Sequence, residues 1–278
     1  MKLLTLLLVF TGITLQAQIE TPQPSPASKV EQKIGLTDVT LEYSRPSMRG
    51  RTIFGDLVPF GKKWRTGANA NTKITFSTDV VIDGKDLKKG AYAIYTIPNK
   101  DSWDIIFYSD AKNWGLPREW DDSKVALKTS VKPQILPFEF ETFEMGFDGL
   151  ADPNHGSLFI LWENTLISVK INVPTEKIAM KSIEKVLAGP TANDYFGAAR
   201  YFYDINKDLK QALEWVNKAV AMNPDAFWMT RQKSLIQAKM GDKKGAIATA
   251  KTSLAVAEKA GNANYVKMNN ESIAKWSK

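Results

Sequence analysis

The chain has 278 residues, of which 44% are hydrophobic and 24% charged, the composition of a globular protein long enough for two domains. It contains no cysteine, which excludes disulfides, thiolate metal sites, a cysteine nucleophile and the lipidated cysteine of a bacterial lipoprotein. The formal charge of +7 comes mostly from scattered lysines. Nucleic-acid-binding proteins gather their basic residues on one element, so we expect no nucleic-acid partner.

Residues 1–17 have the pattern of a secretory signal peptide. Lys2 supplies the positive start, and Leu3 to Leu15 form an apolar run that is too short to span a bilayer. Ala17 is the small residue expected before the cleavage site, so the mature chain would begin at Gln18. The sequence therefore predicts an exported, soluble protein, periplasmic or secreted, without a membrane span.

After a proline-rich leader at residues 18–28, residues 29–174 have the pattern of an antiparallel β-sandwich or barrel. Val39, Leu41 and Tyr43 alternate with polar residues at the period of a strand. Further strand-like runs occupy residues 30–34, 73–78, 80–82, 91–97, 103–109, 125–131, 138–147, 157–162 and 166–173. The last two runs flank Glu163-Asn164-Thr165, which predicts a closing hairpin. Residues 112–122 interrupt the pattern and predict a loop or a single helical turn.

Arginine is concentrated in residues 45–71, which we call the arginine loop. Four of the seven arginines of the chain lie there, whereas the thirty lysines are dispersed. Arginine presents a rigid fork of donors that suits carboxylates, phosphates and backbone carbonyls. Glycines at positions 50, 55, 61 and 67 allow sharp turns, so we expect a compact, ordered loop.

Several short motifs follow one another around this loop. They are Gly35-Leu36-Thr37-Asp38-Val39, Tyr43-Ser44-Arg45-Pro46, Gly50-Arg51, Phe54-Gly55 and Trp64-Arg65-Thr66-Gly67-Ala68-Asn69. In this order they resemble the domain-of-unknown-function 2911 family, over roughly residues 24–173. The resemblance implies an exported bacterial protein with a β-rich domain, often followed by tetratricopeptide-like helices. It implies no activity and no catalytic residue.

Between residues 175 and 278 the spacing of apolar residues becomes that of helices. The sequence therefore predicts an α+β multidomain protein. Ala188-Gly189-Pro190 ends a first helix, Thr191 and Asp194 form a capping box, and Asn223-Pro224 predicts a helix start. Gly241-Asp242 ends one helix and caps the next, Gly261 ends that one, and residues 263–276 form the last.

Two of these predicted helices are related by an offset of 34 residues. Asp208 corresponds to Asp242, and Ala212 corresponds to Ala246. This period is typical of tetratricopeptide helical hairpins. Fewer than three repeats rarely fold alone, so we expect these helices to dock on the β domain or on a partner protein.

The arginine loop is the candidate ligand site. Its predicted ligand-binding residues are Arg45, Arg49, Arg51, Trp64, Arg65, Thr66, Asn69 and Asn71. The arginines would converge on an anion, the threonine and asparagines would add neutral hydrogen bonds, and Trp64 would form an apolar wall. In the alternative interpretation the arginines only lock the loop, by bonding backbone carbonyls or by pairing with Glu42 and Asp56.

The other candidates give weaker signals. His155, the only histidine, lies in a turn-like segment, and Asp148 and Asp152 do not have the spacing of a calcium loop, so we predict no metal and no cofactor. Trp114 and Trp120 could form a stacking platform for sugars, whereas the strand pattern around Trp103 predicts interior packing.

We therefore predict a non-enzymatic exported protein that binds an anionic or carbohydrate ligand through the arginine loop and packs or recruits a protein through its helices. An envelope glycan or peptide hydrolase or lyase, using aspartate or glutamate with arginine, is the first alternative. A helical scaffold that binds peptides is the second alternative. Carboxylate pairs are recognised by their separation in space, which the sequence does not give.

Overall fold

The computed structural model of the protein describes residues 21–186 and 190–278. The predicted signal peptide and the start of the predicted leader lie outside these residues, as does the predicted end of the first helix at residues 188–189. The chain divides into two compact units, of which the first ends at Thr175 and the second is Glu176–Lys278. None of the described helices combines the length and the apolarity needed to cross a membrane.

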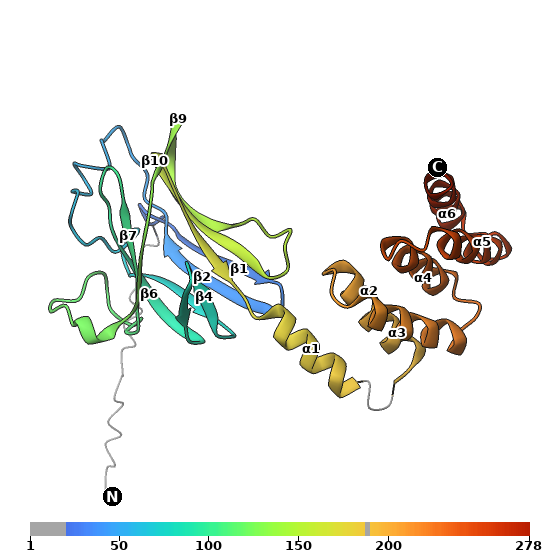
Figure 1. The fold of residues 1–278 in the computed structure, drawn as a ribbon. Coiled ribbons are helices and arrows are strands. Elements are labelled where there is room, and N and C mark those ends of the chain that lie inside the picture. The colour runs from blue at the N-terminus through green and yellow to red at the C-terminus, as the bar shows by residue number, and fades with distance from the viewer. Residues whose placement is uncertain (1–20, 187–189) are drawn as a thin grey trace, which may run out of the picture. The chain divides into compact units, whose positions relative to one another are not determined.

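The first unit is built from antiparallel strands in two sheets, so the predicted β-sandwich is confirmed (Figure 1). The strands are β1 (Ala27–Ile34), β2 (Thr37–Ser44), β3 (Thr72–Phe76), β4 (Val80–Ile82), β5 (Lys85–Leu87), β6 (Gly90–Ile97), β7 (Trp103–Tyr108), β8 (Val125–Val131), β9 (Gln134–Asp148) and β10 (His155–Asn172). The six-stranded sheet has the order β1-β2-β3-β6-β7-β8, and the four-stranded sheet has the order β5-β4-β10-β9. The segment before the short 3₁₀ turn η1 (Asp122–Lys124) is a loop, as predicted.

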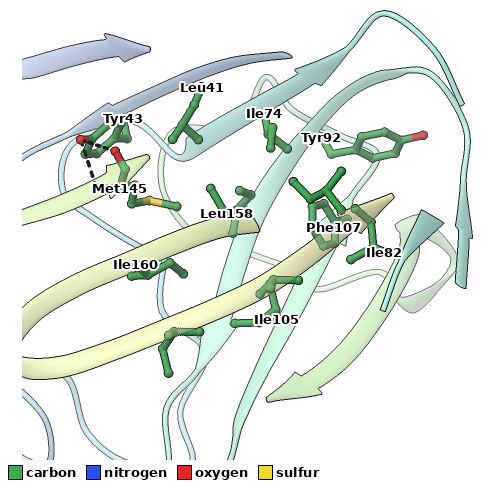
Figure 2. Packing of buried hydrophobic residues seen from close by; sticks show 14 of the residues in the cluster. Leu41, Tyr43, Ile74, Ile82, Tyr92, Ile105, Phe107, Met145, Leu158 and Ile160 are labelled. Atoms are coloured by element: carbon green, nitrogen blue, oxygen red, sulfur yellow. Dashed lines mark hydrogen bonds between the residues drawn. The ribbon is translucent and has the colours of Figure 1, made fainter. Parts of the chain in front are cut away.

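Alternating apolar side chains from the two sheets form one core. Leu41 and Ile74 come from the six-stranded sheet, Leu158 and Ile160 come from β10, and all four are at most 1% exposed (Figure 2). A polar link crosses this core, because the Tyr43 hydroxyl donates to the Met145 carbonyl oxygen at 2.9 Å and accepts from the Met145 amide at 3.1 Å. Both partners of this buried hydroxyl are therefore backbone groups of β9, so the bond links the two sheets through the core and satisfies the hydroxyl.

The predicted hairpin at residues 163–165 is wrong, because β10 runs through these residues without turning back. Glu163 has a φ of 52°, and the pairing of β10 with β9 shifts register on both sides of it. Between Leu161 and Thr165 of β10, the paired residues of β9 run from Glu144 to Ile135, so the extra residues of this irregularity lie on β9. The polar residues that resemble a turn in the sequence therefore lie inside one long strand, opposite a bulge in its partner.

The second unit consists of helices. They are α1 (Thr175–Val186), α2 (Ala192–Asp204), α3 (Leu209–Met222), α4 (Phe227–Lys239), α5 (Lys243–Lys259) and α6 (Ala263–Trp276), with the first residue of α1 belonging to the β unit. The capping box of Thr191 and Asp194 at the start of α2 is confirmed. The predicted helix start at Asn223 is wrong. Asn223 caps the carboxyl end of α3, and α4 starts after Ala226, which has no side-chain cap.

The 34-residue offset is visible in the helix caps and in the packing. Asp208 caps α3 by accepting from the Gln211 amide, and Asp242 caps α5 in the same way from Gly245. Ala212 and Ala246 are both fully buried. Consecutive helices from α2 to α6 pack on one another. This arrangement is an α-helical region with two related helices, and its assignment to the tetratricopeptide class stays a prediction.

Candidate functional site

The arginine loop connects β2 to β3 and contacts both sheets on its way. Ser47 forms an isolated bridge with Thr142 of β9, and Trp64 forms another with Thr96 of β6. The second bridge is reciprocal, with N–O distances of 2.8 and 3.0 Å. Because β9 and β6 belong to different sheets, the loop is attached to each of them and is ordered, as its glycines predict.

Every arginine of the loop donates to at least one backbone carbonyl. Arg45 Nε reaches the Phe143 oxygen at 3.1 Å, and Arg49 Nη2 reaches the Pro24 oxygen at 3.1 Å. Arg51 uses Nε and Nη2 for the carbonyls of residues 48 and 47, at 2.8 and 2.7 Å. Arg65 Nη1 reaches the carbonyl of residue 69 at 3.0 Å. The locking role that the sequence left as an alternative is therefore present at all four positions.

The carboxylates around the loop are not those that the sequence pointed to. Arg45 pairs with Glu144 at 3.1 Å, whereas Glu42 pairs with Lys73 at 2.6 Å. Glu163 binds no arginine and accepts from the backbone amides of Ile53 and Phe54, at 3.0 and 3.3 Å. The sequence gives no signal for this anchor, because Glu163 is 110 residues away from its partner and resembles part of a turn.

Trp64 belongs to both the core and the loop. Its ring stacks on Trp162 with a centroid distance of 5.9 Å and lies edge-on to Phe143 at 5.4 Å. Its indole nitrogen donates to the Gly67 carbonyl oxygen at 3.2 Å, which closes the turn that follows. The side chain is half-buried, so it fills space between the sheets and still forms a wall at the surface.

The turn after Trp64 has a left-handed backbone at two residues that are not glycine. Thr66 has a φ of 57° and Asn69 a φ of 58°. Such a conformation is strained for a β-branched residue, and strain of this kind is maintained only where surrounding contacts hold it. The Thr66 hydroxyl donates to the Thr96 hydroxyl at 3.1 Å and the residue is fully buried, so Thr66 holds the turn from the inside.

A pocket of about 490 Å³ opens beside this turn, and four of the predicted ligand-binding residues line it. Its lining residues are Ser25, Pro46, Arg51, Leu57, Val58, Trp64, Arg65, Gly67, Ala68, Asn69, Trp114 and Trp162. We call it the arginine pocket. The predicted residues Arg45, Arg49 and Thr66 do not line it, and Asn71 lines a neighbouring pocket instead.

The arginine pocket is positively charged. Arg51 and Arg65 line it, and within the described part of the chain neither aspartate nor glutamate does. The backbone bonds of Arg51 engage Nε and Nη2, and that of Arg65 engages Nη1, so each guanidinium retains N–H groups for an oxygen ligand. Two guanidinium groups held in place by their own loop have remaining donors of the kind that suits an oxyanion.

Trp114 completes the arginine pocket from the 111–121 loop and is 76% exposed. The next residue, Gly115, is buried with a φ of 73°, and a Cβ placed on it would lie 3.0 Å from Arg65 Nη1. The Gly115 carbonyl also accepts from the Tyr95 hydroxyl at 2.9 Å. Glycine thus lets this loop lie directly on the Arg65 guanidinium, which holds the backbone beside Trp114 in place.

The remaining sequence candidates lie elsewhere. Trp103 is buried in the core, and Trp120 packs on Tyr95 and donates to Asp122 at 2.8 Å. His155 Nε2 lies 3.4 Å from the Asp152 carboxylate and lines neither of the two pockets described. No cluster of three metal-ligating side chains occurs among residues 21–186 and 190–278.

Comparison with known families identifies the β unit. Residues 25–171, more than half of the chain, match the family model described as "Protein of unknown function (DUF2911)". The chain belongs to this family. The match to this family of unknown function covers the arginine loop and both residues that charge the arginine pocket. Comparisons with curated proteins and with solved structures found no match.

Proposed function

We propose that the β unit is a non-enzymatic binding domain whose arginine pocket holds the acidic group of a small or carbohydrate ligand. The observation that carries this proposal is that Arg51 and Arg65 line one pocket, to which no carboxylate of the described residues contributes. The exposed Trp114 supplies an apolar face beside the two guanidinium groups, and such a combination orients a ligand that has both an acid and a ring.

The same pocket argues against glycan hydrolysis, the first form of the enzyme alternative. General acid–base cleavage of a glycan requires two carboxyl groups that face each other across the bond. Two carboxylates contact the arginine loop without lining the pocket. Glu163 accepts from the loop backbone, and Glu144 pairs with Arg45. Binding therefore agrees better with the arrangement than cleavage does.

We also propose that the protein is exported and that its helical unit serves protein packing or protein interaction. The signal pattern of residues 1–17 supports export. The related caps of α3 and α5 support a repeat that uses a small buried residue at each helix crossing. A concave helical face for a peptide stays the second candidate for this unit.

The test compares single lysine variants at arginines inside and outside the pocket. The probe is galacturonate, a sugar with one carboxylate. Lysine keeps the positive charge of arginine but lacks its planar set of donors. Arg51→Lys and Arg65→Lys should therefore each weaken galacturonate binding about tenfold or more, which corresponds to ~1.4 kcal/mol. Binding is measured by isothermal titration calorimetry, and folding is checked by urea denaturation. Arg49→Lys is the matched control, because Arg49 also bonds a backbone carbonyl but lies outside the pocket.

The two interpretations of the loop give different patterns. A purely locking role predicts that all three variants lose stability and that none selectively loses galacturonate binding. Equal loss of binding in Arg49→Lys, or full binding in Arg65→Lys, would contradict the proposed function.

A further inference from the structure

A second pocket of about 480 Å³ adjoins the arginine pocket. It is lined by Ala27, Ser28, Lys29, Glu42, Tyr43, Ser44, Ala70, Asn71, Lys73, Ala111, Lys112, Asn113 and Trp114. Trp114 lines both pockets, and the consecutive residues Asn69 and Ala70 line one each. The two pockets therefore meet at Trp114 and at the Asn69–Ala70 segment.

The charge of the second pocket differs from that of the arginine pocket. Lys73 pairs with Glu42 at 2.6 Å, and Lys29 pairs with Glu31, so both of these lysines have a carboxylate partner. The rest of the polar lining consists of hydroxyl and amide side chains, with the exposed Lys112 at the rim. Such a surface suits groups that both donate and accept hydrogen bonds, which is the chemistry of sugar hydroxyls, and Lys112 is compatible with an acidic sugar.

A buried polar atom on the floor of this pocket lacks a partner. Asn71 is 8% exposed, and its Nδ2 makes no hydrogen bond within the residues that the structure describes. Burial raises the pKa of the neighbouring Tyr95 phenol and the Asn71 amide opposes this rise, while the Tyr95 hydroxyl donates its own proton to the Gly115 carbonyl oxygen. A buried donor of this kind is satisfied by ordered water or by a ligand oxygen, directly or through that water.

Trp114 lines both pockets with an exposed side chain. Gly115 and Tyr95 hold the backbone beside it, whereas its own ring is 76% exposed. An aromatic face fixed at its base and open to solvent stacks on the apolar face of a ring without a large loss of side-chain entropy. Because Trp114 lines both pockets, a sugar ring stacked on it would have substituents or adjoining units that reach into each pocket.

We propose that the ligand is an acidic oligosaccharide that lies across Trp114, with a carboxylate in the arginine pocket and the adjoining sugar in the second pocket. This inference rests on the proposed function and extends it to the second pocket. The lining favours a sugar over a peptide, because its non-polar residues apart from Trp114 and Tyr43 are the alanines at 27, 70 and 111, which form no deep apolar hole for a side chain.

The experiment measures how binding depends on ligand length. Galacturonate and its linear dimer and tetramer are titrated into the mature protein by isothermal titration calorimetry. The tetramer should bind at least about tenfold more tightly than the monomer, which exceeds the statistical gain from its additional carboxylates. Ala111→Phe fills the second pocket and should remove this gain while leaving the affinity for the monomer unchanged.

Two further variants keep the result interpretable. Ser28→Phe fills the second pocket from β1, in case the change in the loop disturbs folding. Ala126→Phe, on an exposed position of β8 outside both pockets, is the matched control and should keep the gain. Each variant is checked by urea denaturation before titration.

Several outcomes would overturn the inference. Monomer binding that depends on Arg65 but shows no gain with length would overturn the two-pocket ligand and leave the proposed function intact. A gain that survives both Ala111→Phe and Ser28→Phe would place the additional units elsewhere. Tetraglutamate binding as tightly as the sugar tetramer would overturn the carbohydrate assignment in favour of an acidic peptide, and failure of galacturonate to bind at any length would overturn both proposals.

Discussion

Arginine side chains stabilise the arginine loop from within. A long connection leaves backbone carbonyls without strand partners, and an unpaired carbonyl is costly once it is removed from water. Arg51 satisfies two such carbonyls at once, at 2.8 and 2.7 Å, because its donors lie in one rigid plane. A guanidinium retains further donors after such bonds, so locking the loop and facing a pocket are compatible roles for the same residue.

Glu163 is the residue on which the loop conformation should depend most. Its carboxylate accepts from the amides of Ile53 and Phe54, and Ile53 is fully buried. Glu163→Ala leaves both amides without their acceptor, so we expect the free energy of unfolding to fall by about 1–3 kcal/mol. Urea denaturation followed by tryptophan fluorescence measures the change.

A matched glutamate on the neighbouring strand provides the control for this prediction. Glu139 on β9 is exposed, and Glu139→Ala should change the free energy of unfolding by less than about 0.5 kcal/mol. If the two variants are equally stable, the Glu163 carboxylate does not anchor the loop.

At the scale of elements, β9 and β10 determine where the loop can lie. β9 binds the first part of the loop through its backbone. The Met48 amide donates to the Glu141 carbonyl, and the Phe143 amide donates to the Pro46 carbonyl. Between these two bonds, Thr142 forms the bridge with Ser47. β10 continues as one strand and places the Glu163 carboxylate against the backbone amides of Ile53 and Phe54. The register shift between β9 and β10 therefore lies at the residue that anchors the loop.

The helical unit offers a test of the predicted repeat. Ala212 and Ala246 occupy equivalent positions, and both are fully buried. Replacing either with leucine adds volume at a helix crossing, so each variant should lose about 1–3 kcal/mol of unfolding free energy. The losses should be similar if the helices are related, as judged by the loss of helical circular dichroism in urea.

Exposed alanines of the same two helices serve as controls for this prediction. Ala221→Leu on α3 and Ala255→Leu on α5 should be close to neutral. A large loss at Ala212 together with a negligible loss at Ala246 would argue against the repeat.

At the scale of the whole molecule, export is the prediction with the simplest measurement. The protein expressed in a bacterium with two membranes should be recovered from the periplasm or the medium, with a mass that corresponds to a first residue of Gln18. A variant without residues 2–17 should stay in the cytoplasm. Recovery of the full-length mass from the cytoplasm would contradict export.

Local signals explain how much of the fold the sequence predicted. Period-two alternation gave the strands around Leu41, and the capping box of Thr191 gave the start of α2, because both depend on neighbours only a few residues away. The prediction at Glu163 failed because a left-handed polar residue inside a strand resembles a turn in the sequence. The prediction at Asn223 failed because an asparagine before a proline also suits the end of a helix.

The sequence by itself determined the family, the β-rich unit followed by helices, and the segment that carries the candidate site. Only the tertiary structure decided that Arg51 and Arg65 share a pocket while Arg45 and Arg49 do not. The bridges from Ser47 to Thr142 and from Trp64 to Thr96 bring distant parts of the chain together. Arg51 and Arg65 bond carbonyls only three or four residues away, but the long-range bridges determine where these local turns lie, and such bridges leave no periodic pattern in the sequence.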